Sequence, residues 1–349
     1  MRLSDIQQRL KGQKVKRLIC NFFNPLTFLP FYLFTLISCT EEIDIKFKTS
    51  DVRLVVEGGI SFDTIAHTII LSTTMPYFSS NDDIPFVSNA YVTITEFDES
   101  MQQTRVFSLT ENSTKKGHYQ TDPDVYGKQR HTYRLDISNV NVGKHTNYTA
   151  EAYFPPIADR IDSIRAVWGQ NLLLLLLTGR APDTTSRRTG WNIEVFADDP
   201  PGENYYLMVL YKNGVALNDT LTRLLLLDNQ MVDQSNIGLR GLPMAFISDS
   251  SWMAAKVGDT IELEIRGVSR EYYRYIHEFI DVYGGTNPMF GGAPANVRGN
   301  ISGGAIGYFW AHGSRRASDI ADKSKTSTIV WCETLRQWIP ESLFPFLCR

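Results

Sequence analysis

The segment NAYVTITEF, residues 89–97, decides the fold class, because apolar and polar residues alternate along it. Three of its apolar side chains fall on one side of an extended chain: Ala90, Val92 and Ile94. A period of two, with many β-branched residues, predicts a strand that buries one face only.

The same alternation recurs through the first half of the chain. Examples are VRLVVEG (52–58), HTYRLDI (131–137) and NYTAEAYF (147–154). Pro155 and Pro156 follow directly and stop the pattern, which is typical of a strand end and a domain boundary. About seven short strands separated by turn residues predict an immunoglobulin-like or transthyretin-like β-sandwich over residues 51–156.

Residues 157–349 predict a second β-sandwich-like domain with one helix. Strands are expected at RIDSIRAVW (160–168), WNIEVFA (191–197) and DTIELEIRGV (259–268), and Asn213-Gly214 predicts a tight hairpin. The leucine runs 172–177 and 224–227 are interpreted as buried strands, with exposed hydrophobic segments as the alternative. A helix is expected near 269–283, capped by Ser269 and ended by Gly284.

The N-terminus has the layout of an export signal. A basic segment, Lys11–Arg17, precedes an apolar run from Leu26 to Ile37 that Pro30 interrupts. This run is shorter than the ~20 residues that a membrane-spanning helix needs, so a spanning anchor is the weaker interpretation.

Leu36, Ile37, Ser38 and Cys39 resemble the lipobox of bacterial lipoproteins, in which a peptidase cuts before the cysteine and lipid is attached to its sulfur. The resemblance implies that residues 1–38 are a lipoprotein signal peptide and that Cys39 is lipidated. The alternative is a chance cysteine in a signal peptide cut elsewhere. Residues 39–50 would then be an acidic and polar tether. Its Glu41-Glu42 pair resembles the signal that sends Bacteroidetes lipoproteins to the cell surface.

Charge argues against nucleic acid as a partner. The segment 1–38 carries six Lys or Arg and one Asp, so removing it subtracts a net +5 and takes the formal charge from −3 to −8. A protein that binds nucleic acid neutralises phosphates with basic groups, and the mature chain has no long basic run for this.

Cysteine usage agrees with export. Cys20 leaves with the signal and Cys39 would be lipidated, so only Cys332 and Cys348 remain. A disulfide between them is the expectation from the oxidising compartment alone, and its loop of about 15 residues would contribute roughly 3 kcal/mol. Two free thiols, or a metal site with further ligands, remain as alternatives.

No motif predicts an enzyme. The six histidines have no metal-ligand spacing, and each is interpreted as a lone surface residue. No serine lies in a nucleophile elbow, and no glycine-rich loop ends in the Lys-Ser/Thr of a phosphate-binding loop. Asp82-Asp83 and Asp198-Asp199 are better explained as solvated turns than as calcium ligands. We therefore expect neither a cofactor nor a metal.

Several pieces of sequence, taken together and in order, resemble one family. They are the lipobox with its acidic tether, LVVEGGI (54–60), YRLDI (133–137), YTAEAYFPP (148–156), IDSI (161–164), EYYRYI (271–276), NPMF (287–290) and NISGGAIGYFWA (300–311). The chain resembles the Bacteroidetes outer-membrane lipoproteins of the domain-of-unknown-function family DUF4249, which are encoded beside TonB-dependent transporters. The family would have a more closely spaced cysteine pair near the C-terminus than Cys332 and Cys348.

The resemblance implies an outer-membrane protein, lipid-anchored and exposed on the cell surface, that assists or binds substrate for a TonB-dependent nutrient transporter. The alternative is a structural or adhesive surface sandwich. Aromatic residues on glycine-rich segments supply flat contact surface at low entropic cost. The candidate contact residues are Tyr308, Phe309 and Trp310, followed by Phe290 and Trp252. The alternative for AIGYFWA is a core strand.

Overall fold

The computed structural model describes residues 51–75, 84–142, 145–157, 160–178, 189–229, 239–249, 253–283, 297–326, 329–340, 343 and 348. Residues 51–349 form one compact unit. The predicted signal peptide, Cys39, the tether, Trp252 and Phe290 lie outside the described residues, and the boundary expected at residue 156 stays a prediction.

Among the described residues between 51 and 156, seven strands form, as the alternation predicts. They are β1 (Leu54–Ser61), β2 (Thr68–Thr73), β3 (Tyr91–Phe97), β4 (Gln103–Glu111), β5 (His118–Gln120), β6 (Thr132–Ser138) and β7 (Tyr148–Tyr153). On β6 the predicted inner residues Tyr133, Leu135 and Ile137 are all buried. They belong to a core, here called the sandwich core, to which β1, β2, β3 and β7 also contribute.

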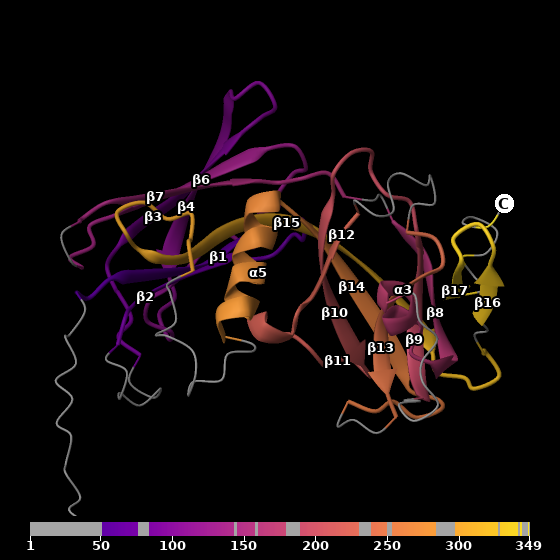
Figure 1. Ribbon diagram of the computed structural model, residues 1–349. Helices are drawn as coiled ribbons and strands as arrows, with labels where there is room; N and C mark the ends of the chain where they lie inside the picture. Colours follow the sequence, from indigo (N-terminus) through magenta and orange to yellow (C-terminus); the bar gives the residue numbers. More distant parts are fainter. Residues whose placement is uncertain are drawn as a thin grey trace, which may run out of the picture. The chain divides into compact units, whose positions relative to one another are not determined.

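The remaining chain is also mainly β. Its elements are β8 (Ile161–Gln170), α3 (Leu172–Thr178), β9 (Thr189–Ala197), β10 (Tyr205–Lys212), β11 (Val215–Ala216), the 3-10 helix η2 (Leu221–Arg223), β12 (Leu225–Asp228), β13 (Leu242–Ser248), β14 (Thr260–Val268), α5 (Arg270–Tyr283), β15 (Ile306–Ile320), β16 (Ile329–Cys332) and β17 (Gln337–Pro340). Figure 1 labels the α-helices and strands among these elements.

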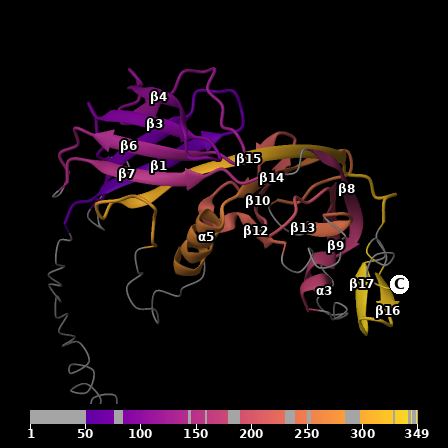
Figure 2. The same ribbon diagram turned by 90° about the horizontal axis from the view of Figure 1, so that it is seen from above.

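Within the described residues the largest sheet contains 12 strands, and β15 links its two parts. Its order is β11-β10-β14-β15-β1-β2-β5-β4-β3-β6-β7, with β12 beside β10. Residues 306–312 of β15 pair in parallel with 55–61 of β1, and residues 313–320 pair antiparallel with 260–267 of β14. Figure 2 shows β15 running between β1 and β14. The segment that follows α5 therefore returns to complete the sandwich begun by residues 54–61.

A second apolar core lies between β10 and β14 on one side and the three-stranded sheet β13-β9-β8 on the other. On β14, Ile261, Leu263 and Ile265 are buried, as their alternation predicts. Trp191 of β9 is fully buried, and its indole nitrogen donates to the Ala255 carbonyl at 2.9 Å. The predicted fold class is confirmed: the protein is mainly β and sandwich-like.

The leucine run 172–177 was predicted to be a strand, and this prediction is wrong because it forms helix α3. The Asn171 side chain caps the helix, since its Oδ1 accepts from the Leu174 amide at 2.9 Å. Leu172 and Leu175 are buried while Leu174 is 48% exposed, which is a helical spacing. Six identical side chains carry no alternation from which this could be read.

The hairpin follows the prediction. The second leucine run forms the expected strand, but of its four leucines only Leu224 is buried and the other three are half-buried. Asn213 and Gly214 have φ values of 51° and 80°, which a tight turn between β10 and β11 requires. The run 224–227 overlaps β12, which pairs with β10.

Candidate functional site

Helix α5 positions one side of the candidate site. Ser269 caps it, because its Oγ accepts from the Tyr272 amide at 3.2 Å, and Glu271 lies in the first turn. Tyr272 and Ile276 are the buried residues of the helix and pack against residues of β10 and β14. The predicted cap and helix are confirmed.

Alternate residues of β15 supply the other side. Tyr308, Trp310 and His312 share one face of the strand, because successive side chains point to opposite faces. Their rings join those of α5 in a continuous set, called the aromatic cluster below: Tyr272, Tyr275, Phe279, Tyr283, Tyr308, Trp310 and His312.

Ring contacts inside the aromatic cluster are close. The Tyr308 ring centroid lies 4.9 Å from that of Tyr272 and 4.8 Å from that of Tyr275. Phe279 and Tyr283 are 4.6 Å apart in the same measure. Tilted pairs at these separations each contribute about 0.5–1.5 kcal/mol beyond the burial of their surface.

Exposure of the aromatic cluster is graded along α5. Tyr272 and Tyr308 are buried, Tyr275 and Phe279 are half-buried, and Tyr283 is 51% exposed. Burial raises the pKa of the Tyr275 hydroxyl to about 12 and raises that of Tyr308 as well. These hydroxyls therefore stay neutral at physiological pH. One end of the cluster is fixed in the protein and the other meets solvent.

The three neighbouring candidates on β15 separate. Tyr308 and Trp310 belong to the aromatic cluster, whereas Phe309 is 0% exposed and lies in the sandwich core. Asn300 holds the strand at this point, because its side chain accepts from the Phe309 amide at 2.9 Å and donates to the Phe309 carbonyl at 2.7 Å. For Phe309 the structure thus favours the alternative of a core strand.

A polar group adjoins the aromatic cluster at His312. Glu264 of β14 is buried; its Oε1 accepts from Nε of Arg266 and its Oε2 from Arg316, each at 2.7 Å. The Tyr211 hydroxyl donates to the same carboxylate at 2.6 Å. Burial alone would raise the pKa of Glu264, but these donors and their charges hold it below its ordinary value.

His312 is a buried histidine that sequence reasoning missed. Its ring lies parallel to that of Trp310, with centroids 4.3 Å apart, and its Nδ1 has no hydrogen-bond partner among the described residues. Burial, followed by the nearby charge of Arg266, lowers its pKa to about 3. His67 is also buried, with a lowered pKa caused mainly by burial. The prediction that every histidine lies at the surface is wrong for these two.

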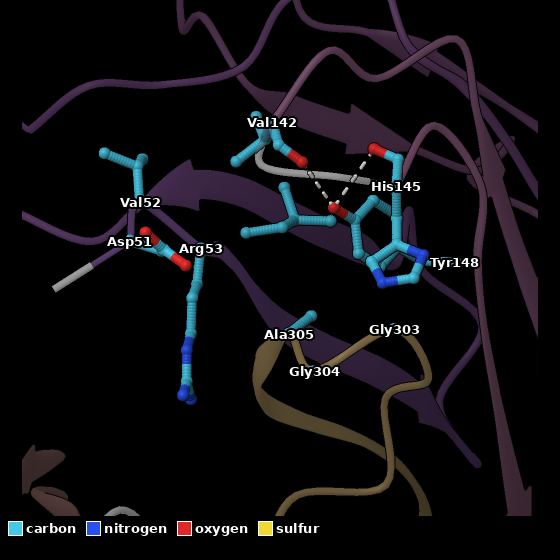
Figure 3. Close-up of a pocket in the computed structure, with 10 residues that line it drawn as sticks. Asp51, Val52, Arg53, Val142, His145, Tyr148, Gly303, Gly304 and Ala305 are labelled. Carbon is cyan, nitrogen blue, oxygen red and sulfur yellow. Dashed lines mark hydrogen bonds between the residues drawn. The ribbon is translucent and has the colours of Figure 1, made fainter.

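A cavity of about 400 Å³ lies at the start of β1. Its walls come from Asp51–Leu54, from the segment around Val142, His145 and Tyr148, and from Gly303–Ala305 (Figure 3). The Tyr148 hydroxyl donates to the Val142 carbonyl at 2.8 Å, which ties this segment together. No sequence motif pointed to this cavity, because its residues come together only through the pairing of β1 with β15.

Cys332 and Cys348 are joined by a disulfide, with their Cα atoms 5.7 Å apart. Cys332 is buried in the second core, and Cys348 packs against it. Within the described residues, no group of three or more His, Cys, Asp or Glu side chains is placed to hold a metal ion.

In the same part of the chain, no helix has the length and apolar character needed to cross a membrane. None of the curated proteins compared with the chain matches it. Among solved structures, trypsin-activated alpha-2-macroglobulin from Escherichia coli shares 9% identity over 64% of this chain, with a TM-score of 0.19. The chain spans only 15% of that protein, and so low a TM-score supports no argument. The family described as a domain of unknown function, DUF4249, matches residues 40–318. The chain therefore belongs to the DUF4249 family.

Proposed function

We propose that this chain is a lipid-anchored protein of the outer-membrane surface that serves a TonB-dependent nutrient transporter as an accessory or substrate-binding component. The anchor rests on the lipobox-like Leu36–Cys39 and on the acidic pair Glu41-Glu42, which follow an export signal. The transporter rests on the resemblance of the ordered sequence pieces to lipoproteins encoded beside such transporters.

The graded exposure of the aromatic cluster is the observation that carries the contact. Tyr308 and Tyr272 fix one end, and Phe279 and Tyr283 present their rings at the other. Rings held in place lose little side-chain entropy on binding, and tyrosine is enriched at interface positions that dominate affinity. We place the contact with the transporter or its substrate at this open end.

The anchor is tested by Cys39→Ala. Without the thiol no lipid can be attached, so we expect the variant to move from the membrane to soluble fractions. Membrane retention of this variant would contradict the anchor and would favour an uncleaved signal segment.

The partner is tested by affinity capture from intact outer membranes with the tagged wild-type protein, followed by identification of the captured proteins. We expect a TonB-dependent transporter in stoichiometric amount. Capture without any such transporter would favour the alternative function, a structural or adhesive surface protein.

A further inference from the structure

We propose that the cavity at the start of β1 binds an anionic oxygen group, such as a phosphate, through Arg53. This cavity is separate from the aromatic cluster, and anion binding there does not depend on the transporter. The cavity volume of about 400 Å³ lies within the range of small-molecule sites. It exceeds what a phosphate alone needs, so a larger phosphorylated ligand also fits.

Arg53 is an exposed cation on this wall. Within the described part of the chain no ion pair involves its guanidinium, whereas Arg105, Arg266 and Arg316 each pair with a buried glutamate. Its backbone is held by Thr74, whose Oγ1 accepts from the Arg53 amide at 3.0 Å. A guanidinium presents several N–H donors in one plane, which suits phosphate and carboxylate oxygens.

His145 faces the same cavity from another segment (Figure 3). Its ring stands edge-on to that of Tyr148, with centroids 6.1 Å apart, and the Tyr148 hydroxyl is also within 3.3 Å of the His145 carbonyl. Tyr148 thus packs beside His145, whose imidazole lines the side of the cavity away from the Arg53 guanidinium (Figure 3).

The third wall requires glycine. Gly303 and Gly304 have φ values of 68° and 72°, which strain any other residue. A Cβ at Gly303 would also lie 3.0 Å from the Tyr148 ring and 3.3 Å from Cγ of His145, so a side chain there would crowd this wall. At Gly304 a Cβ would meet nothing within 4 Å, so the backbone conformation alone demands glycine.

Asp51 is the opposing charge in the cavity lining. Its carboxylate forms no ion pair with Arg53 and would repel an anion bound there. Substitutions of the two residues should therefore have opposite effects. Removing the Arg53 cation should weaken binding of the anion, and removing the Asp51 carboxylate should strengthen it.

Two kinds of ligand could supply the phosphate group. A free phosphorylated solute is one. The other is the headgroup of a phospholipid, and this source rests on the proposed lipid anchor at Cys39. Asp51 lies 12 residues after Cys39, and an extended chain of that length keeps the cavity within ~40 Å of the membrane.

The test is calorimetric titration of the purified full protein in nonionic detergent with inorganic phosphate and, separately, with short-chain phosphatidylglycerol. We expect saturable binding of at least one, weakened at least tenfold in Arg53→Gln and strengthened about threefold in Asp51→Asn. Arg274→Gln is the matched control, because Arg274 is an exposed arginine on α5 outside this cavity, and it should bind as the wild type does.

Preference for phosphatidylglycerol over inorganic phosphate would assign the site to a membrane lipid, and the reverse would assign it to a solute. Absence of saturable binding of both probes would overturn the proposal. Equal binding by wild type and Arg53→Gln would overturn it as well. Because Arg53 is exposed, equal thermal unfolding midpoints of the three variants will show that differences in affinity do not come from misfolding.

Discussion

The two faces of β15 differ in what they bury. On one face Phe309 and Ala311 close the sandwich core and are almost inaccessible to solvent. On the other, Tyr308 and Trp310 meet α5 in a cluster that becomes exposed toward Tyr283. Adjacent aromatic residues of one strand therefore have different surroundings, because successive side chains of a strand point to opposite faces. Fold stability should depend on the first face and partner binding on the second.

The largest effect is expected from a matched pair, Phe309→Ala and Phe279→Ala. Phe309→Ala leaves a cavity in a closed core and should lower the free energy of unfolding by about 3–5 kcal/mol. Phe279→Ala removes the same atoms from a half-buried site and should cost about 1–2 kcal/mol, because its surroundings include solvent. Denaturant unfolding measures both. Equal losses would contradict the distinction between the two faces.

The disulfide belongs to the second core, which includes neither Phe309 nor the aromatic cluster, and its effect should rank next. Replacing Cys332 and Cys348 together by alanine should lower the free energy of unfolding by about 3 kcal/mol, because the bond restricts the unfolded chain over a separation of 16 residues. Mild reduction of the wild-type protein should reproduce this loss and leave the double variant unchanged. A double variant as stable as the oxidised wild type would show that the bond contributes nothing to folding.

His312 makes the α5 face of β15 sensitive to acid. Folding lowers its pKa from 6.5 to about 3, so below pH 6.5 the unfolded chain binds a proton that the folded protein excludes. Stability should therefore be complete above pH 6.5 and fall by up to about 2 kcal/mol by pH 5 from this residue.

The matched variant is His312→Phe, which keeps a flat ring and removes the titration. Its unfolding free energy should depend less steeply on pH between 7 and 5, with the remaining slope coming from His67. Above pH 5 the carboxylates Glu96 and Glu264, whose pKa values are lowered from 4.5, contribute little to this slope because they are largely ionised in both states. An unchanged slope would contradict the burial of a neutral His312.

Much of the fold was predictable because its signals are local. The alternation of apolar and polar residues predicted β3, β6 and β14. Asn213 and Gly214 adopt the positive φ values of the expected hairpin, and Ser269 caps the expected helix. The strand predicted for the leucine run 172–177 was wrong because six leucines show neither alternation nor helical spacing. The parallel pairing of β1 with β15 was not predictable, since it joins segments about 250 residues apart.

The candidate sites were less predictable. Tyr308 and Trp310 were found from their aromatic composition, but the same argument selected Phe309, since composition does not assign a face without a register. The Arg53 cavity needed three distant segments. Burial of His312 and Glu264 depends on cross-strand partners that no spacing in the sequence reveals.

The smallest effect on stability is expected at the exposed end of the aromatic cluster. Tyr283→Ala should change the free energy of unfolding by less than about 1 kcal/mol, because the side chain is 51% exposed in the last turn of α5. Tyr91→Ala is a matched control on β3, where the tyrosine is 70% exposed. A loss of several kcal/mol in Tyr283→Ala alone would mean that this ring belongs to the core.

The most direct test of the proposed contact uses these two variants in affinity capture. Equal amounts of lipidated wild type, Tyr283→Ala and Tyr91→Ala are compared for the TonB-dependent transporter recovered from intact outer membranes. We expect equal recovery by wild type and Tyr91→Ala and at least a fivefold loss in Tyr283→Ala, equivalent to about 1 kcal/mol of binding free energy. Equal recovery by all three proteins would contradict a contact at the aromatic cluster.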